Sequence, residues 1–290
     1  MLRQRIAPLS HRILPNRVGA RPLIPGHVLA SSAEKFSICT KVYPPLDAQH
    51  GSFMSIYDAP GIDDCTLLTE HSLGRFSQLA ATKRTLRLMP LGGSVTYGVG
   101  SSDGNGYRQF LGDMLLADGY QVRFVGSRRS GSMNNGDNEG WRGYRLDQIE
   151  TKARRCVATL LPKVFTVNAG SNDCIQDFQL EGFGLRMGSM LEYFWQTSPA
   201  STVILSTLLV NADKDVNSRV LRINDQLREL AQSKAAEQKR IVLADMNSPE
   251  GPQLGDLVDG THPDDKGYKK MAAIWFNAIR QARNQDFLKA

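Results

Sequence analysis

From Leu86 onward, short apolar runs alternate with longer amphipathic stretches, and this alternation limits the folds that the chain can adopt. The apolar runs are rich in aliphatic and β-branched residues, as buried strands are. They are LRLMPL (86–91), YQVRFVG (120–126), KVFTVNA (163–169), TVILSTLL (202–209) and RIVLADM (240–246). Each is followed by a stretch of helical length that has one apolar face. Five such strand–helix units predict a parallel α/β sheet with helices on both faces.

The size of this region narrows the prediction to an open sheet. Residues 86–290 are too few for a (β/α)8 barrel, which needs roughly 250 residues. We therefore expect one doubly wound domain over 86–290, a three-layer α/β/α sandwich. In such sheets, ligands bind beyond the carboxyl ends of the strands. The functional groups are therefore expected in the loops that follow strands.

Residues 1–85 lack this periodicity and contain frequent Pro, Gly and Ser, which predicts an N-terminal extension that is largely disordered or a leader. Five Arg and no acidic residue precede Glu34. This composition is compatible with an organellar transit peptide, and also with a disordered leader or a misassigned translation start. The extension has no continuous apolar segment of the kind found in secretory signal peptides. No apolar run in the chain reaches the length of a membrane span.

The charge distribution and the cysteine content argue against a nucleic-acid-binding protein, a disulfide-stabilised fold and a zinc site. Residues 1–85 hold ten Lys/Arg and six Asp/Glu, whereas residues 86–290 hold twenty-five and twenty-three, so most of the net charge of +6 precedes the predicted domain. We therefore expect no nucleic-acid partner. Four cysteines are too few for a disulfide framework in a chain of this size, and none forms a CxxC pair, so we expect no zinc site. They are Cys39, Cys65, Cys156 and Cys174.

His262 is the one histidine within 86–290, and it lies in the segment DLVDGTHPDD after the fifth predicted strand. Asp259 precedes it by three residues, and Gly260 permits the tight turn that brings this carboxylate to the imidazole Nδ1. The pair is a candidate general base with its orienting carboxylate. The alternative is a surface turn in which Asp259 caps the loop and His262 has no catalytic role.

Ser94 follows the first predicted strand by three residues, after Gly92 and Gly93, and is the candidate nucleophile. The alternative is a solvated serine of a glycine-rich loop. Ser102 competes by motif, because GSSDG (100–104) matches G-x-S-x-G. A nucleophile elbow directly follows a strand, however, and Ser102 trails the first strand by about ten residues.

Two other loops offer hydrogen-bond donors for an oxyanion. GDNEGWRGYR, after the second predicted strand, holds the backbone N–H groups of Gly140 and Gly143. NAGSNDC, after the third, holds the side-chain amide of Asn172. Acyl-transfer enzymes need such donors where the tetrahedral oxyanion forms. Combined with a serine and an Asp/His pair on two other post-strand loops, they predict an acyl-transfer site.

These four loops resemble the sequence blocks of the SGNH (GDSL-type) hydrolase superfamily. The blocks are PLGGSVTYG with Ser94, EGWRGY with Gly143, AGSND with Asn172, and DGTHP with Asp259 and His262. Within the superfamily, the chain is similar to fungal esterases allied to carbohydrate esterase family 3, through YGVGSSDGNGYR, DNEGWRGYR and DGTHPDDKGYKKMA. The resemblance covers nearly all of 86–290.

The resemblance implies a flavodoxin-like five-stranded parallel sheet and a catalytic triad of Ser94, His262 and Asp259. It also implies an oxyanion hole made by the N–H groups of Ser94 and Gly143 and the Asn172 amide, with no metal or cofactor.

The chain departs from the family at Gly93, where the nucleophile is usually preceded by Asp, and we expect this to affect the loop rather than the chemistry. Arg142 lies where relatives often carry a smaller or apolar residue. Trp141 lies beside the candidate oxyanion glycine, so Trp141 and Arg142 are the candidate substrate-binding residues.

The predicted function is hydrolysis of short-chain acyl esters, acetyl in particular, on a small molecule or a carbohydrate. Lipolytic or thioesterase activity at the same site is one alternative, and a non-catalytic binding module of the same fold is another. We expect a monomer. The compartment stays open: the resemblance suggests a secreted protein, but no signal peptide is visible, and the Arg-rich N-terminus is compatible with an organellar leader.

Overall fold

The computed structural model describes residues 84–289, and the predictions for 1–83, including the leader, lie outside the described residues. The strands are β1 (Arg84–Gly92), β2 (Tyr120–Phe124), β3 (Arg128–Arg129), β4 (Asp137–Gly140), β5 (Val164–Asn168), β6 (Thr202–Ser206) and β7 (Ile241–Ala244). The helices are α1 (Ser94–Tyr97), α2 (Tyr107–Ala117), α3 (Leu146–Leu160), α4 (Ser171–Ile175), α5 (Phe183–Thr197), α6 (Lys214–Ala236) and α7 (Asp265–Asn284), with a 3-10 turn at Leu254–Asp256.

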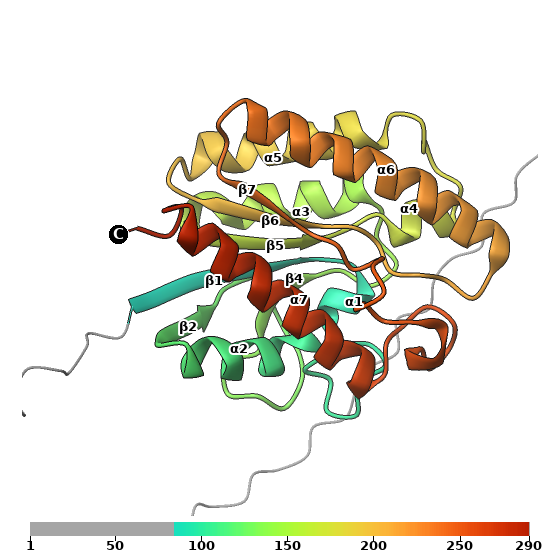
Figure 1. Ribbon diagram of the computed structural model, residues 1–290, viewed down its shortest axis with the longest axis horizontal. Coiled ribbons are helices and arrows are strands. Elements are labelled where there is room, and N and C mark those ends of the chain that lie inside the picture. Colours follow the sequence, from blue (N-terminus) through green and yellow to red (C-terminus); the bar gives the residue numbers. More distant parts are fainter. Residues whose placement is uncertain (1–83, 290) are drawn as a thin grey trace, which may run out of the picture. The chain divides into compact units, whose positions relative to one another are not determined.

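Five of the strands form a parallel sheet in the order β2-β1-β5-β6-β7. These are the five strands that the apolar runs predict, and their order is that of the flavodoxin-like doubly wound fold. Figure 1 shows α2 and α7 on one side of this sheet and α3, α5 and α6 on the other. The predicted α/β/α sandwich is confirmed.

Neighbouring strand residues serve opposite faces of the sheet, as the two-residue period of a strand requires. In β1, Leu88 packs in the core beneath α2 and α7, whereas Met89 packs in the core beneath α3, α5 and α6. Val164 and Phe165 divide in the same way in β5. All four side chains are fully buried. Two cores on one sheet explain why these strands read as continuous apolar runs rather than as alternating ones.

The sheet has seven strands, so the prediction of five omits the short strands β3 and β4. The DNEG sequence of β4 is polar and carries no strand signal. β4 nevertheless pairs in parallel with the end of β1, opposite Leu91 and Gly92, while β2 pairs with the beginning of β1. The loop after β4 therefore starts at the carboxyl edge of the sheet, beside the end of β1.

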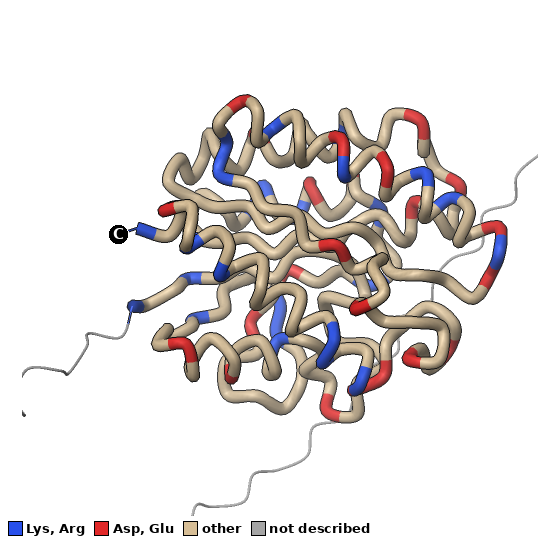
Figure 2. Tube along the Cα trace, viewed as in Figure 1, with Lys and Arg blue, Asp and Glu red and all other residues tan. Residues whose placement is uncertain are grey.

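Figure 2 shows acidic and basic positions interspersed over the helices that surround the sheet. Within residues 84–289, no helix is both long and apolar enough to cross a bilayer.

Candidate active site

Ser94 is the first residue of α1, a single helical turn that starts two residues beyond the end of β1. The junction requires glycine at position 92, because a Cβ there would lie 2.0 Å from the Asn168 carbonyl oxygen and 2.4 Å from Thr96 Oγ1. The close approach fixes where the chain turns out of the sheet. The N–H groups in the first turn of a helix have no intrahelical acceptor, so the N–H of Ser94 is open to another partner.

The loop after β7 brings His262 to Ser94 across 168 residues of sequence. Ser94 Oγ lies 2.7 Å from His262 Nε2, and His262 Nδ1 lies 2.7 Å from Asp259 Oδ2. A carboxylate only accepts hydrogen bonds, so Nδ1 carries the proton and Nε2 presents its lone pair to the Ser94 hydroxyl. The arrangement suits removal of a proton from Ser94.

The other oxygen of Asp259 is held by its own loop. Asp259 Oδ1 accepts from the backbone N–H groups of Thr261 and His262, at 3.0 and 2.8 Å. Burial raises the pKa of this carboxyl, but the hydrogen bonds from the His262 side chain and from these two N–H groups outweigh burial, so that the pKa lies below its ordinary value. The carboxylate therefore stays ionised beside the imidazole.

Contacts outside the predicted residues hold the histidine loop in place. Leu257 and Pro263 form a bridge across it, and the Val258 N–H donates to the His262 carbonyl at 2.9 Å. At its far side, the Tyr268 hydroxyl on α7 donates to the Val99 carbonyl at 2.6 Å, which ties α7 to the segment that follows Ser94. Sequence analysis did not find this contact, because no local pattern pairs position 268 with position 99.

Asp256, at the base of the same loop, is a second anchor that sequence analysis missed. Its side chain is only 3% exposed, forms ion pairs with Lys266 and Lys270, and accepts from the Gln253 N–H at 2.8 Å. The Gln253 N–H, followed by Lys270, lowers the pKa of this carboxyl from 3.8 to about 2.

We expect Asp256→Asn to lower the free energy of unfolding by about 2 kcal/mol near neutral pH. The native carboxyl has the lower pKa, so its stabilisation is present above about pH 4 and is lost as the pH falls toward 2. Urea unfolding of both proteins at several pH values measures this, and the difference between them should narrow on acidification. A difference that does not change with pH would contradict an ionic origin.

Asn172 lies beside Ser94 in the first turn of α4. Its Nδ2 donates to the Tyr144 carbonyl at 3.0 Å, which leaves the second N–H of the amide free. A Cβ built at Gly93 would lie 3.4 Å from this nitrogen. A cavity of only about 10 Å³ opens here. It is lined by Gly93, Ser94, Val95, Tyr144, Asn168, Gly170, Ser171 and Asn172.

The two glycines of the second loop, Gly140 and Gly143, differ in whether their N–H is available to an oxyanion. The Gly140 N–H donates to Asn138 Oδ1 at 2.9 Å, so it is not available as an oxyanion donor. Gly143 is exposed with a φ of 78°, and its N–H has no acceptor among residues 84–289. Gly143 is not among the residues that line the small cavity, and neither are Trp141 and Arg142.

Asp173 links the loops that carry Asn172 and Gly143. It is fully buried, accepts from the Leu146 N–H at 2.9 Å, and pairs with Arg186 at 3.0 Å. Burial raises its pKa, against the Leu146 N–H and Arg186, which lower it. The contact joins the start of α3 to α4, and so fixes the second and third loops relative to each other.

Ser102 takes no part in this arrangement. It is exposed between α1 and α2, and its N–H donates to Asp265 Oδ1 at 2.9 Å. His262 bonds to Ser94 and not to Ser102.

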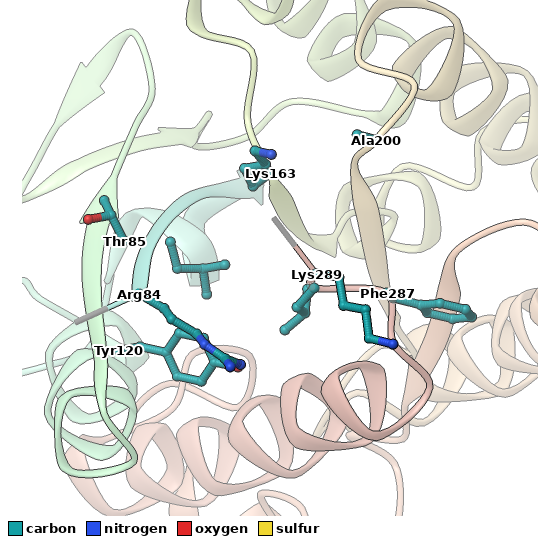
Figure 3. Close-up of a pocket in the computed structure, with 9 residues that line it drawn as sticks. Arg84, Thr85, Tyr120, Lys163, Ala200, Phe287 and Lys289 are labelled. Atoms are coloured by element: carbon teal, nitrogen blue, oxygen red, sulfur yellow. The ribbon is translucent and has the colours of Figure 1, made fainter. Parts of the chain in front are cut away.

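A larger cavity, of about 330 Å³, lies at the opposite edge of the sheet, where β1, β2 and β5 begin (Figure 3). None of its lining residues is a Ser, His, Cys or acid, so it contains no set like that of Ser94, His262 and Asp259. They are Arg84, Thr85, Leu86, Tyr120, Lys163, Ala200, Phe287, Leu288 and Lys289.

Residues 91–270 match the model of the GDSL-like Lipase/Acylhydrolase family. A multidomain esterase of Ruminococcus flavefaciens is 29% identical over 242 residues, which are 73% of this chain and 30% of that protein. This chain thus spans less than a third of the length of that relative.

Two solved structures share the fold. The family 3 carbohydrate esterase of Clostridium thermocellum is 26% identical with a TM-score of 0.63, over 70% of this chain and 99% of that one. A carbohydrate esterase family 3 protein of Talaromyces cellulolyticus is 20% identical with a TM-score of 0.60, over 69% and 99%.

Proposed function

Because this chain belongs to the GDSL-like lipase/acylhydrolase family, we propose that it is a carboxylic ester hydrolase, a serine esterase specific for short acyl groups. The observation that carries the proposal is the continuous pair of 2.7 Å contacts from Ser94 through His262 to Asp259. We assign Ser94 as the nucleophile, His262 as the general base and acid, and Asp259 as the group that orients the imidazole.

In the acylation step, Ser94 Oγ attacks the ester carbonyl carbon while His262 Nε2 takes the hydroxyl proton. The new C–O bond pushes the carbonyl electrons onto oxygen and forms a tetrahedral oxyanion. Collapse of this intermediate breaks the bond to the alcohol, which leaves with the proton that His262 returns. Asp259 stays ionised throughout and stabilises the imidazolium.

Three donors are proposed for the oxyanion: the Ser94 N–H, the free N–H of the Asn172 amide, and the Gly143 N–H. The first two line one cavity, which supports them as a pair. Gly143 is exposed on the neighbouring loop, and its assignment requires the oxyanion to lie within hydrogen-bond distance of that loop as well. Water then repeats the cycle on the acyl-enzyme, with His262 as its base.

The size of the cavity supports a short acyl group. About 10 Å³ of space for the centre of a water-sized sphere is close to the minimum that holds one water molecule, so the space beside Ser94 and Asn172 leaves no room for an alkyl chain. This argument favours acetyl esters over lipolytic or thioesterase substrates. Similarity to the Clostridium thermocellum carbohydrate esterase suggests a carbohydrate as the alcohol.

We expect kcat/KM on 4-nitrophenyl esters to fall by at least about tenfold between the acetate and the octanoate, because each added methylene lacks space beside Ser94. The shared leaving group keeps the chemistry constant along the series. Rates are compared after subtraction of spontaneous hydrolysis. A higher kcat/KM for the octanoate would contradict the acetyl assignment and favour a lipolytic function.

A further inference from the structure

Three aromatic side chains lie near the Ser94 cavity: Trp141 and Tyr144, whose rings are in contact, and Tyr97, which shares the Arg128 guanidinium with Trp141. Tyr97 ends the helix that Ser94 begins, and Tyr144 lines the cavity itself. The rings of Trp141 and Tyr144 lie 5.4 Å apart. The Trp141 backbone N–H donates to the Gly92 carbonyl at 2.8 Å, so this group is attached to the end of β1.

Three cations from different elements lie against these rings. The Arg128 guanidinium, from β3, lies 4.5 Å from the Trp141 ring centroid and 5.2 Å from that of Tyr97. The Lys152 ammonium, from α3, lies 4.6 Å from the Trp141 centroid and 5.8 Å from that of Tyr144.

The third cation, the Arg142 guanidinium, lies 6.0 Å from the Tyr97 centroid and is exposed on the loop that carries Gly143. We call Arg128, Arg142 and Lys152 the cationic rim. Arg128 and Lys152 lie over the Trp141 ring, and Arg142 lies over that of Tyr97.

The cationic rim has no acidic partner. Within residues 84–289, none of its three members has a carboxylate oxygen within 4.0 Å, whereas neighbouring Arg145 and Arg154 pair with Asp147 and Glu150. The rim thus brings together, around one set of aromatic rings, three cations without an ion pair among the described residues.

Glu139, three residues before Arg142, is fully buried and already engaged. Its oxygens accept from the Ser127 N–H and hydroxyl and from Trp141 Nε1. It balances at most one of the three charges. The aromatic faces offset part of the remaining repulsion by cation–π contact. An anion bound at the rim would offset more of it.

We propose, on the basis of the esterase function above, that the cationic rim binds an anionic group of the substrate, so that the preferred substrates are acyl esters of acidic molecules. The anion is an oxyanion, either a carboxylate as in a sugar acid or a phosphate, because planar guanidinium groups bind both. It lies on the alcohol part of the ester, since the cavity beside Ser94 has no space for it.

The test compares matched acetyl esters that differ in charge. Kinetics are measured on an acetylated glucuronic acid, on the acetylated primary amide of the same sugar, and on acetylated glucose 6-phosphate. We expect kcat/KM for the acid or the phosphate to exceed that of the neutral amide by about tenfold at low ionic strength, and the ratio to shrink as salt is added. Whichever charged ester, the acid or the phosphate, has the larger kcat/KM relative to the amide identifies the anion that the rim binds.

The double variant Arg142→Gln/Lys152→Gln should bring the charged-to-neutral ratio close to one. Arg155→Gln is the matched control, because it removes an exposed charge from the same helix, outside the rim, and should leave the ratio as it is. A merely structural rim would lower the rates on charged and neutral esters equally, and the ratio would survive, which overturns the proposal.

Activity on 4-nitrophenyl acetate distinguishes a failure of the rim proposal from a failure of the esterase function. Wild-type protein that hydrolyses this ester but treats the acid, the phosphate and the amide alike overturns the rim proposal and leaves the esterase intact. Protein that hydrolyses none of these esters overturns both.

Discussion

Replacement of Ser94 by alanine is expected to lower kcat/KM on 4-nitrophenyl acetate by about 10⁴-fold or more. The variant loses the one hydroxyl that lies 2.7 Å from His262 Nε2, and no attacking oxygen remains there except that of water. The fold should be unaffected, because Ser94 is only half-buried and makes no other side-chain hydrogen bond within the described domain. Labelling by a fluorophosphonate, followed by peptide mapping, should likewise be lost.

Ser102→Ala is the control for this experiment. Ser102 bonds through its backbone N–H to Asp265, and alanine keeps that donor, so activity should stay within about twofold of wild type. The opposite outcome would be decisive. Labelling that persists in Ser94→Ala and disappears in Ser102→Ala would move the nucleophile to the serine that fits the G-x-S-x-G motif.

The sequence predicted the fold well because the strands of a doubly wound sheet are buried on both faces. Residues such as Val164 and Phe165 serve two cores and leave a continuous apolar signal. β4 escaped prediction because its pairing is the consequence of where β1 ends, and its DNEG sequence has no apolar face of its own.

The Asp259 and His262 pair was found from local spacing, because three residues and one glycine bring the two side chains together. Asp256, Asp173 and Tyr268 were not found, although they hold the same loops. Tyr268 and Asp173 act on partners distant in sequence, such as Leu146 for Asp173, and one sequence does not reveal such pairings. Asp256 pairs with Lys266 and Lys270, and these contacts depend on how α7 packs against the loop. Contacts within one loop can be predicted from the spacing of its residues, whereas contacts between loops depend on how the sheet assembles them.

Gly93 stands where the family usually has Asp, and the structure shows what this changes near Ser94. Its φ of −93° is open to any residue, and a Cβ there would make only ordinary contact with Asn172 Nδ2, at 3.4 Å. The backbone does not require glycine at 93, in contrast to 92. The missing side chain therefore changes the wall of the Ser94 cavity and leaves the hydrogen bonds of Ser94, His262 and Asp259 in place.

The substitution Asp259→Asn should reduce kcat by about 10⁴-fold while the protein stays folded. Asn keeps an oxygen for the backbone N–H groups of Thr261 and His262, so the turn has no reason to change. It places an NH₂ group 2.7 Å from His262 Nδ1, however, and an NH₂ group donates. The imidazole must then accept at Nδ1 and carry its proton on Nε2, where it faces Ser94 and cannot take the hydroxyl proton.

If this mechanism holds, the loss of activity in Asp259→Asn comes from the changed orientation of the imidazole and not from the loss of a negative charge near the site. Asp265→Asn removes a carboxylate that accepts from the Ser102 N–H nearby, but it does not touch His262, so it should change kcat by no more than about twofold. Steady-state kinetics on 4-nitrophenyl acetate compare the two, with urea unfolding as the check on folding. Equal losses in both variants would mean that charge near the site matters, and would contradict the assigned role of Asp259. A large loss in Asp259→Asn alone would tie catalysis to the proton on Nδ1, which a neutral amide of the same shape cannot hold in place.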